Sequence, residues 1–303
     1  MPKIQTLLVP TDFSEFAAHA FELALDLARR SRAEIHLLHT IHEIDVRTWD
    51  WITVTMPKEE EEIRGELEAD AEQQLSAFMA AHDAHGVAVR PAIRWGPAPA
   101  ETVVAYAAET EADLIVMGSH GRRGVRRMLL GSVTEEVVHT ASCPVMVAHL
   151  PEQTPSLVRR ILVPIDFSAS GAPALDWAET LASSYDACLV LLHVLEDFKP
   201  MEPYEVAFGN LIDEVLPQLE EHARNELERT AASFAGKGLQ TETHVEHGRP
   251  ADGILDFAAR QDVGLIVLAS HGRTGLERLL LGSVAARVMR SAPCPVLIVR
   301  PRS

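Results

Sequence analysis

Residues 7–14 read LLVPTDFS, and residues 161–168 read ILVPIDFS, so Asp166 repeats Asp12 at an offset of 154 residues. A short apolar run that passes into Pro, Asp and Ser is typical of a buried strand followed by a turn and a helix. An interval of this size is a domain rather than a solenoid repeat. The stretch therefore predicts a duplicated α/β domain.

Three further motifs recur along the chain. The LLH motif at residues 37–39 recurs at 191–193 with the same offset, whereas SHG at 119–121 and CPV at 143–145 recur 151 residues later. Three residues are thus missing from the middle of the second copy. We expect one domain at residues 1–150, a Pro-containing linker at 151–156 and a second domain at 157–303, which suits a chain of 303 residues.

Within each copy, short apolar runs alternate with longer helical patterns, which predicts a parallel sheet with crossover helices. We expect five strands per domain, the first and fourth central and the third toward an edge. In the first copy the strands are expected near residues 4–10, 34–41, 87–94, 113–118 and 144–149, with helices near 15–31, 57–84, 99–110 and 132–141. The second copy repeats this plan, with its fourth strand at 264–268 and its long helix near 211–235.

Charge and composition exclude several classes of protein. A formal net charge of −17 would repel nucleic acid and anionic membranes at long range, so neither is an expected partner. No apolar stretch approaches the roughly 20 residues of a membrane span, and the amino terminus lacks a secretory signal, which predicts a cytoplasmic protein. The three cysteines are widely spaced and odd in number, which favours reduced, buried thiols.

A glycine motif follows the predicted fourth strand of the first copy. It has the form G-x2-G-x9-G-S, made by Gly118, Gly121, Gly131 and Ser132. Glycines let backbone amides approach an anion, and we expect Ser132 to cap a helix whose amino terminus attracts phosphate. The spacing has no Walker lysine, so phosphate contacts would come from amides and hydroxyls.

The whole motif set resembles the universal stress protein family in its tandem, two-domain form, over nearly the full length of both halves. The likeness rests on the PTDFS turn, the LLH strand, the glycine motif and the GSV to CPV ending. It implies two five-stranded, Rossmann-like domains of the adenine nucleotide hydrolase type. It also implies ATP, alone or with Mg²⁺, as the ligand.

In the ATP-binding branch of that family, an Asp after the first strand contacts the ribose, residues after the second-strand His flank the adenine, and the glycine motif surrounds the phosphates. In the first copy the resemblance implies a site made of Pro10, Thr11, Asp12, Thr40, Gly118, His120, Gly121, Gly131, Ser132 and Val133. In the second copy it implies Pro164, Ile165, Asp166, Val194, Ala269, His271, Gly272, Gly282, Ser283 and Val284. Ala269 replaces the first glycine there, which puts the second site in question.

Two features of the site have competing interpretations. Asp12 and Asp166 either contact the nucleotide or only cap the helices that follow. A cluster of arginines in the first glycine loop either neutralises phosphate charge or is a solvated basic loop. These arginines are Arg122, Arg123, Arg126 and Arg127, against Arg273 and Arg278 in the second copy.

Histidine is abundant, with 14 residues, but we do not expect a metal site. His36 and His39 would lie on opposite faces of one strand, and no carboxylate or cysteine completes a ligand set around them, around the pair His82 and His85, or around the pair His244 and His247. The acidic run at residues 59–62 is expected to be the solvated face of a helix.

The sequence favours a non-catalytic module in which adenine-nucleotide binding regulates a stress response, since no catalytic constellation is evident. Two alternatives stay open. One is a slow ATPase or a self-phosphorylating protein that uses Ser132 or Ser283. The other is a nucleotide-free scaffold that pairs through its closing strands, 145–148 and 296–299, within one chain or in a homodimer. The protein partner and the signal are not disclosed by the sequence.

Overall fold

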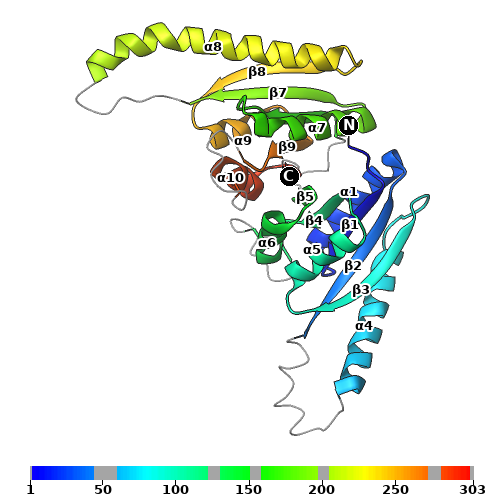
Figure 1. Ribbon diagram of the computed structural model, residues 1–303. Coiled ribbons are helices and arrows are strands. Elements are labelled where there is room, and N and C mark those ends of the chain that lie inside the picture. The colour runs from blue at the N-terminus through cyan, green and yellow to red at the C-terminus, as the bar shows by residue number, and fades with distance from the viewer. Residues whose placement is uncertain are drawn as a thin grey trace. The chain divides into compact units, whose positions relative to one another are not determined.

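The computed structural model describes residues 2–43, 60–121, 130–150, 158–196, 205–271 and 281–300. The chain forms two compact units, one of Lys3–Leu150 and one of Pro151–Ser303 with Met1–Pro2. Both have the α/β architecture that the alternation of strand and helix patterns predicts (Figure 1).

The first half is built around five parallel strands in the order β3-β2-β1-β4-β5. The strands are β1 (Thr6–Thr11), β2 (Glu34–His42), β3 (Val89–Gly96), β4 (Leu114–Gly118) and β5 (Val145–Ala148). The helices are α1 (Glu15–Ser31), α4 (Glu60–Ala80), α5 (Pro99–Glu109) and α6 (Ser132–Thr140). The predicted places of the first, third and fourth strands are confirmed, because β1 and β4 are central and β3 is at an edge.

Helices cover both faces of this sheet (Figure 1). α1 packs on β1 and β4, and α4 packs on β2 and β3. On the other face α5 packs on β2 and β3, and also against α6. After β1 the chain turns toward β2, and after β4 it turns toward β5, so the two connections leave the sheet in opposite directions. Such a switch point opens a crevice at the carboxyl ends of β1 and β4.

The second half repeats this order as β8-β7-β6-β9-β10, again with parallel pairing. Its strands are β6 (Arg160–Pro164), β7 (Cys188–Leu195), β8 (Thr241–His247), β9 (Leu265–Ala269) and β10 (Val296–Val299). Its helices are η1 (Ala169–Gly171, a 3-10 turn), α7 (Ala172–Tyr185), α8 (Glu205–Ala235), α9 (Pro250–Arg260) and α10 (Ser283–Ser291).

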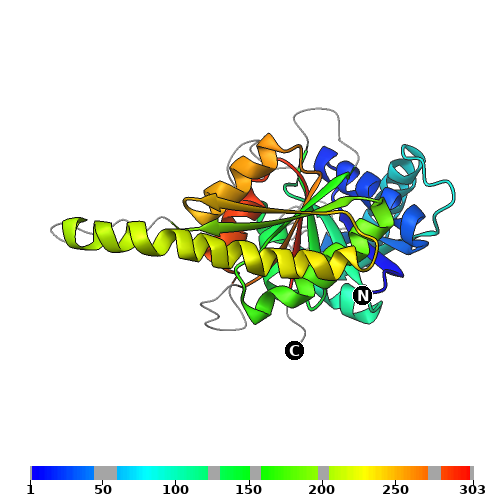
Figure 2. The ribbon, with the colours of Figure 1, turned by 90° about the horizontal axis from the view of Figure 1, so that it is seen from above.

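Two helices of the second half differ from the expectation. α8 begins six residues earlier than expected and has Pro217 in its interior; it lies along β8 and extends past the strand ends (Figures 1 and 2). α7 begins at Ala172, whereas its counterpart α1 begins right after Ser14, the residue that matches Ser168. The 3-10 turn η1 takes the place of the first α-helical turn.

The cores are apolar layers between sheet and helices, as the runs of β-branched and leucine residues dictate. Leu7, Leu8 and Ile115 are fully buried in the first half, as are Ile161 and Leu162 in the second. Each such side chain stabilises the fold by about 1.5–3 kcal/mol. No described helix is long and apolar enough to cross a membrane.

The cysteines are free, but they are less uniformly buried than expected. Only Cys294 is fully buried, and Cys143 and Cys188 are half-buried. Burial raises the pKa of the Cys294 thiol to about 12 and that of Cys143 to about 11. Cys188 has its pKa raised by burial and then by the neighbouring Glu242 carboxylate.

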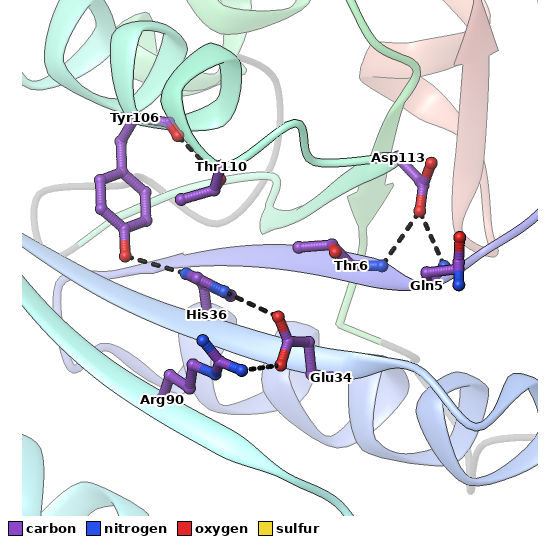
Figure 3. Close-up of polar contacts among 8 residues, drawn as sticks. All are labelled: Gln5, Thr6, Glu34, His36, Arg90, Tyr106, Thr110 and Asp113. Carbon is purple, nitrogen blue, oxygen red and sulfur yellow. Dashed lines mark hydrogen bonds and ion pairs between the residues drawn. The ribbon is translucent and has the colours of Figure 1, made fainter.

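A chain of polar side chains crosses the α5 face of the first sheet (Figure 3). The Tyr106 hydroxyl lies 2.9 Å from His36 Nδ1, and His36 Nε2 lies 3.3 Å from Glu34 Oε1. Glu34 in turn pairs with Arg90 at 2.7 Å. Because Glu34 begins β2, these hydrogen-bonded side chains lie toward the amino ends of the strands, away from the switch point at their carboxyl ends.

Candidate nucleotide site

The turn after β1 presents Asp12 and starts α1. Ser14 is the N-cap of α1, with its Oγ accepting a hydrogen bond from the Ala17 amide at 3.2 Å. Asp12 does not cap this helix: its Oδ1 accepts from the Ser14 amide at 3.1 Å and so holds the turn. The capping interpretation of Asp12 is therefore wrong, because Ser14 fills that role.

Gly118 lies at the end of β4, where α1 begins. A Cβ on Gly118 would lie 2.8 Å from the backbone carbon of Phe16 and 2.9 Å from its carbonyl oxygen. Real Cβ atoms do not approach backbone so closely. The glycine is therefore needed here for close packing of strand against helix, as well as for any approach of a ligand.

Gly121 lies beside Asp12, although 109 residues separate the two in the chain. A Cβ on Gly121 would be 2.6 Å from Asp12 Oδ2. The loop after β4 thus passes against the carboxylate of the first residue after β1. The structure brings together two of the residues that the sequence assigns to one site.

The far end of the glycine loop returns to β4 at Gly131. The Gly131 amide donates to the Ser119 carbonyl at 2.9 Å, and the Thr134 hydroxyl donates to the Gly118 carbonyl at 2.8 Å. Gly131, not Ser132, is the N-cap of α6, and no side chain caps the helix. The expected capping role of Ser132 is wrong, because Ser132 is already the first helical residue.

His120 sits between Gly118 and Gly121 and is fixed from two sides. Its Nδ1 is 3.0 Å from Ser119 Oγ, and its ring packs on Phe16 with centroids 5.0 Å apart. Its Nε2 is buried without a hydrogen-bond partner among the described residues, and the same holds for Nε2 of His271. A buried, unpaired nitrogen costs about 1–3 kcal/mol, which favours a partner in the loop or in a ligand.

The second half reproduces this arrangement with two changes. Gly282 donates to the Ser270 carbonyl at 2.8 Å and is the N-cap of α10, and His271 Nδ1 is 2.8 Å from Ser270 Oγ. Asp166 Oδ1 accepts from both the amide and the hydroxyl of Ser168, at 2.9 and 2.7 Å. Ser168 therefore binds the aspartate, whereas Ser14 caps a helix.

The second half differs from the first both at Ala269 and at the start of α7. Ala269 ends β9 without a positive φ, opposite Val299. In the first half the matching residue is Gly118, on which Phe16 packs. Ser170, the counterpart of Phe16, lies instead in the 3-10 turn η1. The second half thus differs from the first at both of the positions that pack together there.

The other predicted site residues lie at the carboxyl edges of the two sheets. Thr40 lies near the end of β2, and Val194 lies near the end of β7. Val194 also packs on Gly253 of α9, where a Cβ would be 3.0 Å from Val194 Cγ1. Pro10 and Thr11 end β1, Pro164 ends β6 and Ile165 follows it, and Val133, Ser283 and Val284 belong to the first turns of α6 and α10. Gly272, the arginines of both glycine loops and residues 151–156 lie outside the described residues.

Two pairs of residues at the site were not singled out from the sequence. Phe13 stacks on His39, and Phe167 packs on His193, each with ring centroids 4.5 Å apart. The signal was present, since DFS and LLH recur together at the same offset. Apolar and aromatic residues in a motif are usually assigned to the core, and here they adjoin the aspartates.

Among the described residues, no three His, Cys, Asp or Glu side chains lie close enough together to hold a metal ion. His36 and His39 lie on opposite faces of β2, the first against Tyr106 of α5 and the second against Phe13. Of the acidic run, Glu61 and Glu62 are exposed on α4.

The strand order defines each half as a doubly wound α/β domain with a switch point, between β1 and β4 and between β6 and β9. The model of the universal stress protein family matches residues 3–149 and 158–300. A universal stress protein of Mycolicibacterium smegmatis is 32% identical over 302 residues, which cover 98% of this chain and 97% of that protein. The chain belongs to the universal stress protein family, in its tandem form.

Solved structures agree on the fold. A universal stress protein from Archaeoglobus fulgidus superposes with a TM-score of 0.63 at 24% identity, covering 98% of both chains. A putative universal stress protein from Pseudomonas aeruginosa superposes with a TM-score of 0.67 at 17% identity, covering 99% of this chain and 94% of that one. At these identities the likeness concerns the fold alone.

Proposed function

We propose that this protein is a regulatory module that binds an adenine nucleotide, with ATP as the ligand, at the carboxyl edge of the first sheet. The observation that carries the proposal is the contact of Gly121 with Asp12, which joins the loops after β1 and β4 into one site. Such a site at a switch point is where open α/β sheets bind their ligands.

Phosphate recognition would fall to backbone amides. The first turn of α6 has amides that no side chain caps, since Gly131 is the N-cap and offers no acceptor. Phosphate oxygens are stabilised there by these donors and by the positive end of the helix dipole. The Ser132 hydroxyl, at the first helical position, adds a further donor.

Asp12 would bind the ribose. Its Oδ1 is engaged by the Ser14 amide, and its Oδ2 faces Gly121. A carboxylate accepts hydrogen bonds from two vicinal hydroxyls well. Thr40, near the end of β2, would flank the adenine, and Mg²⁺ would be held mainly by the phosphates of ATP.

The second half would bind the nucleotide more weakly. Ala269 replaces the first glycine of the motif, and the Ser168 hydroxyl competes with a ribose for Asp166. Two sites of unequal affinity are therefore expected in one chain.

We propose binding without strong catalysis. Ser119 and His120 have the composition of a nucleophile and its base, but Ser119 is only 1% exposed, as is Ser270 in the second half. A buried hydroxyl cannot reach a substrate. Ser132 and Ser283 are the residues on which slow self-phosphorylation would depend, and the pairing of closing strands within or between chains stays a prediction.

Calorimetric titration of the full chain with ATP, ADP and AMP tests this function. We expect saturable binding of at least one nucleotide per chain, with no ATP hydrolysis above a buffer blank and no phosphate transferred to Ser132. Binding without turnover supports the regulatory module. Turnover above the blank favours the enzyme, and no binding favours the scaffold.

A further inference from the structure

Phe13 and Phe167 have an unusual backbone conformation directly after the two site aspartates. Their φ angles are 66° and 61°, in the left-handed region. A residue with a bulky side chain is rarely found there, because its Cβ crowds the following carbonyl, at a cost of about 1–2 kcal/mol. The same strain occurs at the same place in both halves, so the surrounding structure must impose it.

One histidine in each half packs on the strained phenylalanine. The rings of Phe13 and His39 are stacked, with centroids 4.5 Å apart and planes at 28°. The rings of Phe167 and His193 have the same separation and planes at 37°. Each histidine thus fixes the residue that follows the aspartate.

The same histidine also fixes the residue that precedes the aspartate. His39 Nδ1 lies 2.9 Å from the Thr11 carbonyl oxygen, and His193 Nδ1 lies 2.6 Å from that of Ile165. A carbonyl oxygen only accepts, so Nδ1 carries the proton in both rings. Thr11 and His39 are the last residues paired between β1 and β2, so the side chain adds a hydrogen bond where this pairing ends.

We propose that His39 and His193 are positioning residues that hold Asp12 and Asp166 for the nucleotide. Each histidine donates a hydrogen bond to the carbonyl of the residue before the aspartate, and its ring packs on the phenylalanine after the aspartate. The strained turn then projects the carboxylate into the crevice. This inference rests on the proposed function for its purpose, but the geometry of the turn can be tested without any nucleotide.

The structural test is NMR of the full chain without nucleotide. His39→Leu removes both contacts, so the backbone shifts of Phe13 should leave the left-handed range and those of Asp12 should change. His39→Asn keeps a donor near the position of Nδ1 and provides a second variant if the leucine chain does not fold. It should retain the left-handed shifts of Phe13 in part.

The matched control is His36→Leu, on the same strand but the opposite face. His36 is buried and bonded to Tyr106, and its counterpart in the second half is Val190. This change should lower stability without moving the shifts of Asp12 or Phe13. The control thereby separates a general loss of stability in β2 from the effect of losing the His39 contacts that position Asp12.

The functional test is a coupling experiment with ATP. His39→Leu should raise the Kd of the first site about tenfold, His39→Asn should raise it less, and His36→Leu should leave it unchanged. In an Asp12→Ala chain, His39→Leu should have no further effect on Kd, because the histidine acts through the aspartate. His193→Leu should weaken the second site alone.

The inference is overturned if the backbone shifts of Phe13 are unchanged in His39→Leu. It is also overturned if those shifts change but the Kd for ATP does not, or if His39→Leu raises the Kd by the same factor in the unaltered chain and in the Asp12→Ala chain. If the unaltered chain binds no ATP, the proposed function fails, and the NMR result alone decides whether the histidine grips the turn.

Discussion

Gly121 touches the carboxylate of Asp12 from across the switch point, so closely that a Cβ there would be 2.6 Å from Oδ2. Gly121→Ala should therefore push Asp12 or the glycine loop aside. We expect ATP to bind the first site at least about tenfold more weakly, as measured by calorimetry. The control is Gly65→Ala on α4, where nothing lies within 4 Å; it should leave ATP binding unchanged. Equal affinity in Gly121→Ala and the unaltered chain would contradict the proposed ribose contact.

A substitution at Gly131 should separate an effect on ATP binding from an effect on folding stability. A Cβ there would meet no atom closer than 3.4 Å, so Gly131→Ala has room and should fold with nearly unchanged stability. The same methyl group would face a phosphate at the start of α6, so ATP affinity should fall about tenfold or more. Urea unfolding and calorimetry on the same sample measure both effects. Loss of stability without loss of affinity would show that the glycine serves packing.

The two halves should respond unequally to Gly118→Ala and Ala269→Gly. Gly118→Ala places a methyl 2.8 Å from the Phe16 backbone and should destabilise the first half by about 1–3 kcal/mol through overpacking. Ala269→Gly removes a methyl group at the matching position of the second half, and should cost about 0.5–1 kcal/mol through backbone entropy. Urea unfolding of both variants measures the difference. Similar costs would mean that α1 adjusts as freely as α7.

The pair of Arg160 and Glu242 predicts a pH dependence. Hydrogen bonds from Arg160, at 3.0 and 2.7 Å, hold the pKa of Glu242 below its usual value of 4.5. The stabilisation is present above that value and is lost as the pH falls through the lowered pKa. Because the carboxylate is partly exposed, Glu242→Gln should cost about 1 kcal/mol or less near neutral pH. In urea unfolding, the difference in stability between Glu242→Gln and the unaltered chain should shrink as the pH falls below 4.5, and a difference that does not change with pH would count against the pair.

The thiols should be unreactive in the folded chain. With pKa values of about 11 and about 12, Cys143 and Cys294 carry almost no thiolate near neutral pH, and Cys188 is shifted in the same direction. Alkylation followed by mass spectrometry should be slow in native buffer and rapid at all three positions in denaturant. Fast native labelling at Cys294 would show that it is not buried.

The fold was predictable because its signals are local and repeated. The LLVPTDFS stretch and its copy give a buried strand and a helix start. The alternation that follows gives the parallel sheet, with its first and fourth strands central and its third toward an edge. The late start of α7 was not predictable in this way, because a first helical turn packs on a residue far along the chain, as Phe16 of α1 packs on Gly118. That contact joins residues about 100 positions apart.

The site could be predicted in part. The glycines and Asp12 are recognisable by type and spacing, but the cap of α6 was misassigned, since Gly131 and Ser132 are both good N-cap residues and only the backbone path distinguishes them. The role of His39 depends on a left-handed Phe13, which no propensity favours. Tertiary packing decides such positions.

The most direct test of the central claim is to purify the chain without added nucleotide, denature it, and identify any released small molecule by chromatography and mass spectrometry. The account predicts an adenine nucleotide, up to about one per chain from the first site. It should be absent from a folded Gly121→Val, Gly131→Val chain. No released nucleotide, together with no ATP binding on titration of the unaltered chain, would contradict the claim.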